Sequence, residues 1–187
     1  MSSDDIHKKI DYWIECAGSG TGDSDGHLLT LFSLGISSRA TTFLELGVRG
    51  GSTTLPLLSA AHKNGGHLYS VDIEPANMEI PNDLAPSWTF TQSDSLAYRR
   101  NWPQEDKIDF VYLDDWHAYD HVKHELELLD KLVGPSSIIL VHDLMYGRTE
   151  PFYHSDLSLK EGQWAEGGPY RAIAELDTNF WEFSTLP

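Results

Sequence analysis

The sequence predicts an α/β protein with a single doubly wound, mostly parallel sheet and helices on both faces. Short apolar runs of strand length alternate with segments that have helical spacing. Acidic residues or glycines follow several of these runs, at the strand ends where an open parallel sheet binds its ligands. The chain has 187 residues and shows no internal repeat or linker, so one domain over residues 1–187 accounts for it.

The N-terminal part, residues 1–38, is expected to be helical. Residues 4–16 carry apolar side chains at helical spacing, and residues 27–38 form a second amphipathic segment. A stretch rich in Gly, Ser and Asp at 18–26 separates the two. This part therefore predicts two helices that precede the sheet.

The core, residues 40–143, alternates expected strands with expected helices. The strands are expected at 41–47, 67–73, 88–93, 108–114 and 136–143, and the helices at about 52–62, 95–101 and 119–133. Gly134 and Pro135 give a stop signal to the last of these helices. The strand after it is nearly all apolar, which is typical of a strand buried on both faces.

The C-terminal part begins with residues 144–168, which have no periodicity and several aromatic side chains. A loop of that length in a compact domain is usually functional or disordered, and here it could close over a bound acceptor as a lid. Residues 169–187 are expected to form a final helix, with Pro169 in its first turn, and a last strand.

The composition argues against several classes of partner. The chain has 13 Lys and Arg against 29 Asp and Glu, a net charge of −16, which opposes binding to nucleic-acid phosphates. No apolar run approaches the roughly 20 residues that cross a membrane. The single cysteine, Cys16, cannot form an intramolecular disulfide, and the acidic start is unlike a signal peptide. We therefore expect a cytoplasmic protein without nucleic-acid or membrane partners.

The residues "ELGVRGGST" connect the first expected strand to a helix. Gly47, Gly50 and Gly51 predict a turn that lets a ligand approach the backbone, and a tight strand-to-helix turn is the alternative. The pattern is not GxGxxG, so it does not predict pyrophosphate binding. Glu45 favours a functional turn, because a carboxylate inside an apolar strand is costly without a partner, for which Arg49 is one candidate.

Asp72 ends the second expected strand, about 25 residues after Gly47. An acid at that separation from a glycine turn typically binds ribose hydroxyls. A lone acid at a strand end can also cap a helix or form a turn. Its place in a glycine-turn unit favours the ribose interpretation.

Two further strand ends carry acids and histidines, in "YLDDWH" and "VHD". Asp114 ends one strand, and His142 and Asp143 end the next. Neighbouring parallel strands lie about 4.8 Å apart, so these groups can converge, and a cation between them would relieve their repulsion. Two carboxylates suit Mg²⁺ or Mn²⁺, and the imidazole favours Mn²⁺ or Fe²⁺. Helix caps for the acids and a hydrogen-bonded core histidine are the alternatives.

The glycine turn, the acid after the second strand, "SDS" at 93–95 and "YLDDWH…VHD" follow one another as in class I S-adenosylmethionine (SAM)-dependent methyltransferases, which have a Rossmann-like fold. The resemblance covers about residues 40–187. It is greatest to the metal-dependent O-methyltransferases, namely the catechol, macrocin and cephalosporin-hydroxylase-like group. It implies methyl transfer to a hydroxyl of a small molecule such as a sugar or a phenol.

The resemblance also implies roles for individual residues. The SAM contacts that it implies are Glu45 and Gly47 for the methionine part, Ser52 for its carboxylate, Asp72 for the ribose, Ile73 and Trp116 for the adenine faces, and Asp94 or Ser95 for the adenine edge. The implied ligands of Mg²⁺, or of Mn²⁺ or Fe²⁺, are Asp114, His142 and Asp143. His117 falls where the catechol enzyme has its catalytic lysine, and a histidine there could take the acceptor's proton.

Other histidines compete less well for that role. His121 and His124 lie further along the helix, where its periodicity is expected to carry them away from the strand end. His154 falls in the loop and could contact the acceptor instead. The alternative for His117 is a cap of helix 119–133.

Two features depart from the family pattern. His142 stands where the family usually has a carboxylate. The chain ends after one final strand where the family closes its sheet with a hairpin, so we expect an incomplete antiparallel edge at the C-terminus. Whether the protein forms a homo-oligomer is left open.

Three other functions remain open at this point. A nucleotide- or NAD-binding protein would share Asp72, but the chain lacks GxGxxG and such a protein leaves the later acids and His142 unexplained. A SAM-binding protein without catalysis and a metal-dependent hydrolase are the others. The sequence does not identify the acceptor.

Overall fold

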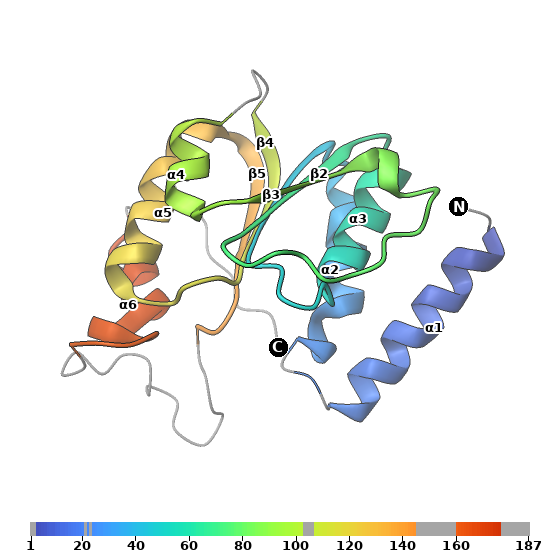
Figure 1. Ribbon diagram of the computed structural model, residues 1–187, viewed down its shortest axis with the longest axis horizontal. Helices are drawn as coiled ribbons and strands as arrows, with labels where there is room; N and C mark the ends of the chain where they lie inside the picture. Colours follow the sequence, from blue (N-terminus) through green and yellow to red (C-terminus); the bar gives the residue numbers. More distant parts are fainter. Residues whose placement is uncertain (1–2, 21, 23, 103–106, 145–159, 177–187) are drawn as a thin grey trace.

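The computed structural model describes residues 3–20, 22, 24–102, 107–144 and 160–176. It contains one sheet of five parallel strands, in the order β3-β2-β1-β4-β5, between two layers of helices (Figure 1). The strands are β1 (Thr42–Leu46), β2 (His67–Asp72), β3 (Trp88–Gln92), β4 (Ile108–Leu113) and β5 (Val133–Val141). The order reverses between β1 and β4, which is the doubly wound arrangement that the sequence predicts.

The helices lie where the sequence places them, within a few residues at each end. They are α1 (Ser3–Ser19), α2 (Leu28–Ser38), α3 (Thr54–Lys63), α4 (Ser95–Arg100), α5 (Tyr119–Leu132) and α6 (Gly168–Ala174). Short 3-10 turns are η1 (Asp25–His27), η2 (Ala85–Ser87) and η4 (Ala165–Gly167). The described helices include none that is both long and apolar enough to cross a membrane.

The alternation of side chains along β1 divides the core into two halves. Phe43 packs with α2 and α3 on one face of the sheet, whereas Leu44 and Leu46 pack with α5 and Ala172 of α6 on the other. Figure 1 shows α2 and α3 on one side of the strands and α4, α5 and α6 on the other. Both faces of the central strands are therefore covered, as a parallel sheet requires.

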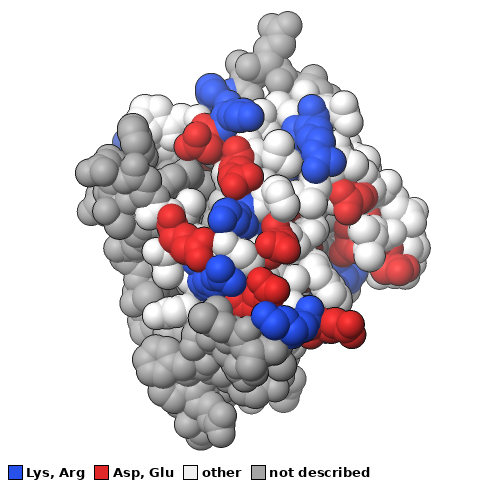
Figure 2. Space-filling model, turned by 90° about the vertical axis from the view of Figure 1, so that its left-hand side faces the viewer, with Lys and Arg blue, Asp and Glu red and all other residues white. Residues whose placement is uncertain are grey.

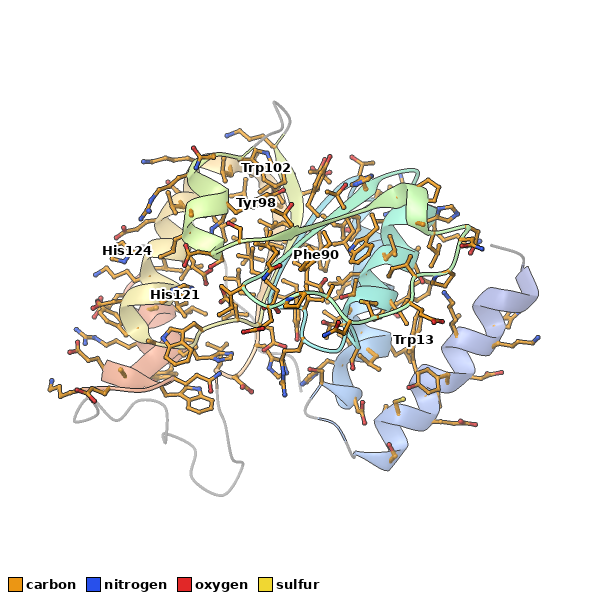
Figure 3. All side chains as sticks on the ribbon, in the orientation of Figure 1. Trp13, Phe90, Tyr98, Trp102, His121 and His124 are labelled. Carbon is orange, nitrogen blue, oxygen red and sulfur yellow. The ribbon has the colours of Figure 1, made fainter. Side chains whose placement is uncertain are left out.

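Helix α1 packs on the outside of the α2 layer rather than on the sheet. Its Trp13 is buried and its ring centroid lies 5.1 Å from that of Phe32 in α2 (Figure 3). The opposite surface, over α4 to α6, carries acidic and basic side chains side by side (Figure 2). Lys123 and Arg171 both pair there with Glu175. The charges on this face are thus mixed, which is typical of a solvated surface.

Strand β5 corrects one expectation. It was predicted to be buried on both faces, but all its residues are partly or fully exposed. Among the described residues it pairs only with β4, so it forms the edge of the described sheet. It also begins at Val133, before Pro135, and its register with β4 shifts between Ile108 and Phe110. An edge strand can hold a proline because one side needs no hydrogen-bond donor. The predicted lid and final strand lie largely outside the described residues.

The glycine turn after β1 passes close to the end of β4. Gly47 has φ +87°, and a Cβ there would lie 2.0 Å from the carbonyl oxygen of Asp114. Glycine is thus required both by the backbone conformation and by the close contact. Gly50, three residues on, has nothing within 4 Å of its Cβ position.

We expect Gly47→Ala to lower the free energy of unfolding by about 2–5 kcal/mol, the combined cost of a left-handed residue and of overpacking. Gly50→Ala is the matched control and should change it by less than about 1 kcal/mol. Urea unfolding of both variants measures the difference. Equal stability of the two would contradict the close approach of Gly47 to Asp114.

Candidate active site

The parallel register brings the predicted site residues to one edge of the sheet. Leu46 of β1 pairs with Val71 of β2 and with Leu113 of β4, which in turn pairs with Val141 of β5. Backbone hydrogen bonds continue past these pairs, from Asp114 to Leu46 and from the residue after Val141 to Leu113. The residues that follow each strand therefore lie side by side, as the sequence predicts.

Four side chains meet at the ends of β4 and β5, and we call them the Asp/His cluster: Asp114, His117, His142 and Asp143. The Nδ1 atom of His142 lies 3.2 Å from an oxygen of each carboxylate. The Nε2 atom of His117 lies 3.6 Å from Asp114 and 3.8 Å from Asp143. One ligand atom from each residue lies within 4.8 Å of all the others, so the group can hold a metal ion.

Carboxylates and imidazoles of the Asp/His cluster shift one another's pKa values strongly. Burial would raise the pKa of Asp114, but the nearby imidazoles of His117 and His142 hold that pKa at about 2. Burial would lower the pKa of His142, but the two carboxylates raise it to about 10. The carboxylates thus favour a positive charge at this point, whether a proton or a metal ion supplies it.

Neighbouring residues hold the Asp/His cluster in place. The hydroxyl of Tyr112 donates to Asp114 at 3.3 Å. The Nδ1 atom of His117 lies 3.0 Å from the Gln163 amide, and its ring stacks on Trp164 with centroids 5.6 Å apart. Asp143 has φ +53°, an uncommon conformation for a residue other than glycine. Backbone strain of this kind is found at functional sites.

Glu45 stabilises the glycine turn through buried hydrogen bonds. Its carboxylate is fully buried and accepts hydrogen bonds from the hydroxyls of Thr53, Thr54 and Ser70 at 2.7–2.8 Å. Hydroxyl groups therefore take the role for which the sequence offered Arg49. Burial, the largest cause, raises the pKa of Glu45 to about 7 against the effect of the three hydrogen bonds. Gly47 and Glu45 together fix the turn, while the turn residue Ser52 is exposed.

Asp72 stabilises the glycine turn by accepting hydrogen bonds from its backbone. One oxygen accepts hydrogen bonds from the backbone amides of Val48 at 2.7 Å and Arg49 at 3.0 Å. The other accepts from the amide of Glu74 at 2.9 Å. A carboxylate has about four lone-pair positions, so capacity remains on the second oxygen. In this structure Asp72 organises the turn and is also free to accept a further donor.

Two large apolar side chains are exposed beside these strand ends. Ile73, after β2, is 66% exposed and Trp116, after β4, is 49% exposed. Asp94 caps α4 by accepting from the amide of Ala97 at 2.8 Å, and Ser95 is buried. The side chains of Ile73 and Trp116 are therefore accessible to a ligand at this edge of the sheet. The Ser95 hydroxyl points inward instead.

Two hollows lie near the sheet ends. One of about 330 Å³ is lined by the glycine turn, including Gly51 and Ser52, and by Trp13 and Leu28 of the N-terminal helices. A larger one of about 440 Å³ lies at the opposite end of the sheet, beside Asp109. The larger hollow has no group of acids and histidines, and Asp109 already accepts two backbone hydrogen bonds there. The chemistry therefore points to the end that holds the glycine turn.

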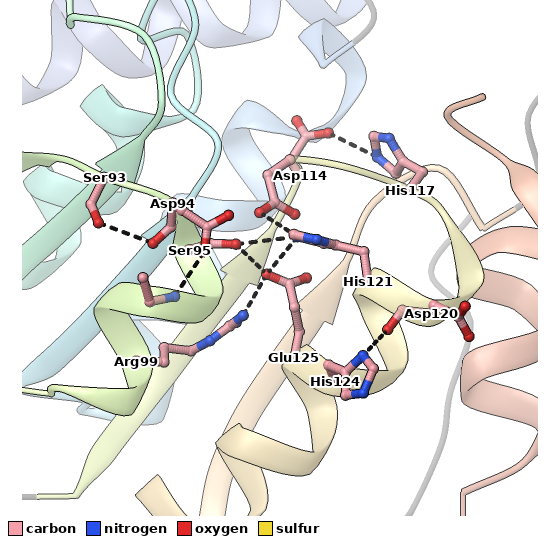
Figure 4. Close-up of polar contacts among 12 residues, drawn as sticks. Ser93, Asp94, Ser95, Arg99, Asp114, His117, Asp120, His121, His124 and Glu125 are labelled. Atoms are coloured by element: carbon pink, nitrogen blue, oxygen red, sulfur yellow. Dashed lines mark hydrogen bonds and ion pairs between the residues drawn. The ribbon is translucent and has the colours of Figure 1, made fainter. Parts of the chain in front are cut away.

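A second group of polar and charged residues lies next to the Asp/His cluster, and it is not predicted as a group from the sequence. We call it the buried polar network; its members are Ser95, Arg99, Asp115, His121 and Glu125. Figure 4 labels all of them except Asp115. Arg99 and Glu125 are both fully buried and lie 2.6 Å apart. His121 lies 3.2 Å from Asp115. Burial would lower the pKa of His121, but Asp115 and Glu125 raise it to about 10.

This network corrects the expectation that His121 points away from the strand end. Its ring instead reaches back to Asp115, two residues after the end of β4. His124 is exposed and bonds to the carbonyl of Asp120 in its own helix, as expected. A signal for the network was present in the sequence, because Glu125 lies on the apolar face of the helix, next to Leu126.

Comparison with known proteins supports the resemblance to methyltransferases. Residues 44–144, more than half of the chain, match the model of a protein family described as a methyltransferase domain. A comparison with curated proteins found no match. Solved structures that resemble the fold include O-methyltransferases from three bacteria.

The three similarities are of comparable strength. The Bacillus cereus O-methyltransferase in complex with SAH has 15% identity and a TM-score of 0.54, over 74% of this chain and 67% of that chain. TomG from Streptomyces achromogenes, in complex with SAM, has 17% identity and a TM-score of 0.61, over 82% and 68%. An O-methyltransferase family protein from Burkholderia thailandensis has 18% identity and a TM-score of 0.52, over 78% and 46%.

The five-stranded sheet, with its reversal between β1 and β4 and its glycine turn, defines a Rossmann-like class I methyltransferase fold. The matched range contains the glycine turn, Asp72 and the whole Asp/His cluster. The chain belongs to the methyltransferase-domain family.

The buried polar network predicts a large cost for removing one of its charges. Glu125→Ala should lower the free energy of unfolding by about 3–5 kcal/mol, because it leaves Arg99 buried without its partner. Glu127→Ala, at an exposed position of the same helix, should change it by less than about 0.5 kcal/mol. Urea unfolding measures both.

A double variant, Arg99→Met with Glu125→Leu, tests the reason for that cost. It removes both charges and should recover much of the stability that Glu125→Ala loses. If the double variant is no more stable than the single one, the uncompensated Arg99 charge is not the cause.

Proposed function

We propose that the protein is a SAM-dependent O-methyltransferase that acts on a hydroxyl group of a small molecule with the help of a divalent metal ion. The observation that carries this proposal is the Asp/His cluster beside the glycine turn. A carboxylate and histidine group with unpartnered imidazole nitrogens next to a cofactor-type turn suits metal-assisted group transfer better than nucleotide binding alone. Location in the cytoplasm and the oligomeric state stay predictions.

The described residues fit SAM. Gly47 packs so closely against the backbone of Asp114 that the turn is held at the end of β4, and Asp72 beside it has capacity for a ribose hydroxyl. Ile73 and Trp116 offer two exposed apolar surfaces for an adenine ring. The hollow beside Ser52 provides room at the other side of the turn for the methionine part.

The Asp/His cluster fits a divalent ion. Asp114, His142 and Asp143 supply two carboxylates and an imidazole, and the buried Nδ1 atom of His142 has no hydrogen-bond partner of good geometry. A bound divalent ion lowers the pKa of a hydroxyl that binds to it and fixes its position. The charge of the two carboxylates is what would retain such an ion.

The chain's own residues then have three tasks. The glycine turn and Asp72 hold the methyl donor in one orientation, because methyl transfer is an in-line displacement that depends on alignment. The Asp/His cluster positions the acceptor hydroxyl. The sequence suggests His117 as the group that accepts the proton of the acceptor hydroxyl. Its Nε2 atom can do so when the ion is held by Asp114, His142 and Asp143 alone. The predicted lid, residues 144–168, lies mostly outside the described residues.

SAM binding is tested by calorimetry with the whole chain. Asp72→Ala should weaken SAM binding by roughly 1.5–3 kcal/mol, about 10- to 150-fold, because it removes an acceptor of hydrogen bonds and loosens the turn. Asp109→Ala is the matched control, since Asp109 also accepts two backbone hydrogen bonds but lies at the other end of the sheet. Tight NAD binding without SAM binding would refute the proposal.

Methyl transfer is tested by following SAM consumption over a panel of sugars, phenols and other hydroxylated metabolites. We expect activity that chelation abolishes and that added Mn²⁺ restores. Asp143→Ala should keep SAM binding while its turnover falls by at least about 100-fold, because the acceptor loses its metal contact. Activity that survives complete chelation would show that no metal is needed, and SAM binding without turnover of any acceptor would favour a non-catalytic protein.

A further inference from the structure

We propose that His117 is a fourth metal ligand, so that the Asp/His cluster binds its ion through two imidazoles and two carboxylates and selects a first-row transition-metal ion over Mg²⁺. This inference rests on the metal site of the proposed function and assigns its ligand set and its selectivity. It gives His117 a role different from the proton acceptor that the sequence suggests.

The geometry places the Nε2 atom of His117 among the other ligand atoms. It lies 3.6 Å from an Asp114 oxygen and 3.8 Å from an Asp143 oxygen. Ligands about 2.1 Å from one ion are separated by roughly 3.0–3.4 Å at octahedral or tetrahedral angles. The measured separations exceed this range by only a few tenths of an ångström, which a small closure around an ion would remove.

The burial of His117 also supports its role as a metal ligand. Its side chain is 6% exposed, and its Nε2 atom has no hydrogen-bond partner of good geometry. The Nδ1 atom of His142 is in the same situation and faces the same carboxylates. Buried polar atoms nearly always have a partner, and an ion in the middle of the Asp/His cluster would give one to both nitrogens.

The surroundings of His117 fix its ring as they would for a ligand. Gln163 contacts Nδ1 at 3.0 Å, on the far side of the ring from the cluster, and Trp164 stacks on its face. A histidine that binds a metal through Nε2 carries its proton on Nδ1 and donates it to an outer oxygen. The Gln163 side chain offers that oxygen after a half turn of its amide, since the two ends of an amide are assigned from their contacts.

The buried polar network shows why the Asp/His cluster, and not its neighbour, is the metal site. Asp115, His121 and Glu125 are also close enough to share an ion. However, the guanidinium of Arg99 already lies 2.6 Å from Glu125 and supplies a permanent positive charge. Among the described residues, the carboxylates of the Asp/His cluster pair with its two histidines and with no lysine or arginine, so the positive charge there must come from a proton or an ion.

The ligand types set the selectivity. Mg²⁺ prefers oxygen ligands in a strict octahedron and keeps several waters. Imidazole nitrogen suits Mn²⁺, Fe²⁺, Co²⁺ and Zn²⁺, and each imidazole in place of an oxygen moves the preference further from Mg²⁺. Two imidazoles in a set of four therefore favour a transition-metal ion.

The experiment titrates the metal-free full chain with Mg²⁺, Mn²⁺ and Co²⁺ by calorimetry, and follows Co²⁺ also by its visible absorption. We expect one Mn²⁺ or Co²⁺ ion per chain and binding of Mg²⁺ at least about 100-fold weaker. His117→Ala should weaken Co²⁺ binding at least about 10-fold and change the absorption spectrum of bound Co²⁺, because a nitrogen ligand is lost. His124→Ala, an exposed histidine on α5, is the matched control and should leave both unchanged.

Gln163→Leu provides a second test that leaves the ligand itself in place, and it should weaken Co²⁺ binding about 10- to 100-fold. SAM affinity and a thermal melt, measured on the same samples, show whether each variant is folded. Mg²⁺ binding as tight as that of Mn²⁺, or an unchanged Co²⁺ spectrum in folded His117→Ala, would overturn the inference. Such a result would leave SAM binding and methyl transfer standing, whereas loss of SAM binding in the unmodified protein would count against the proposed function itself.

Discussion

The hydrogen-bonded register of β1, β4 and β5 is the constraint on which the candidate site depends. Leu46, Leu113 and Val141 lie opposite one another, so the residues that follow them emerge at the same height. Asp114 continues the ladder with a hydrogen bond to Leu46. The glycine turn fits above it only because Gly47 has no side chain. A shift of one residue in any of these strands would turn each following side chain to the opposite face of the sheet and dissolve the site.

Charge compensation distinguishes the two polar groups at this edge. The buried polar network contains its own permanent cation, Arg99, which pairs with Glu125 without any ligand. The Asp/His cluster contains only groups that become positive by taking up a proton. The carboxylates raise the pKa of His142 to about 10, so a proton occupies the position that a metal ion would take. Protons and metal ions thus compete for one place, which is a general property of metal sites built from histidine.

The strand ends were predictable from the sequence because apolar runs and helical periodicity are local signals. The convergence of Asp114 with His142 followed from the spacing of parallel strands, and the structure brings them together. The orientation of side chains was less predictable. His121 was expected to point away from the strand end, yet the carboxylate of Asp115 draws its ring back toward it. The several partners of Asp72 likewise depend on tertiary contacts that spacing alone does not encode.

Part of the surroundings of the Asp/His cluster comes from outside the range that matches the family model, residues 44–144. His27 lies before that range, and its ring meets His142 edge-on with centroids 5.3 Å apart. Trp164 and Gln163 lie after it and hold the ring of His117. The matched core therefore supplies the strand ends and the acids, while the two flanking segments supply the walls around them. On the proposed function, an acceptor bound at the cluster would lie beside these flanking segments, so selection among hydroxylated molecules would arise there more than in the shared core.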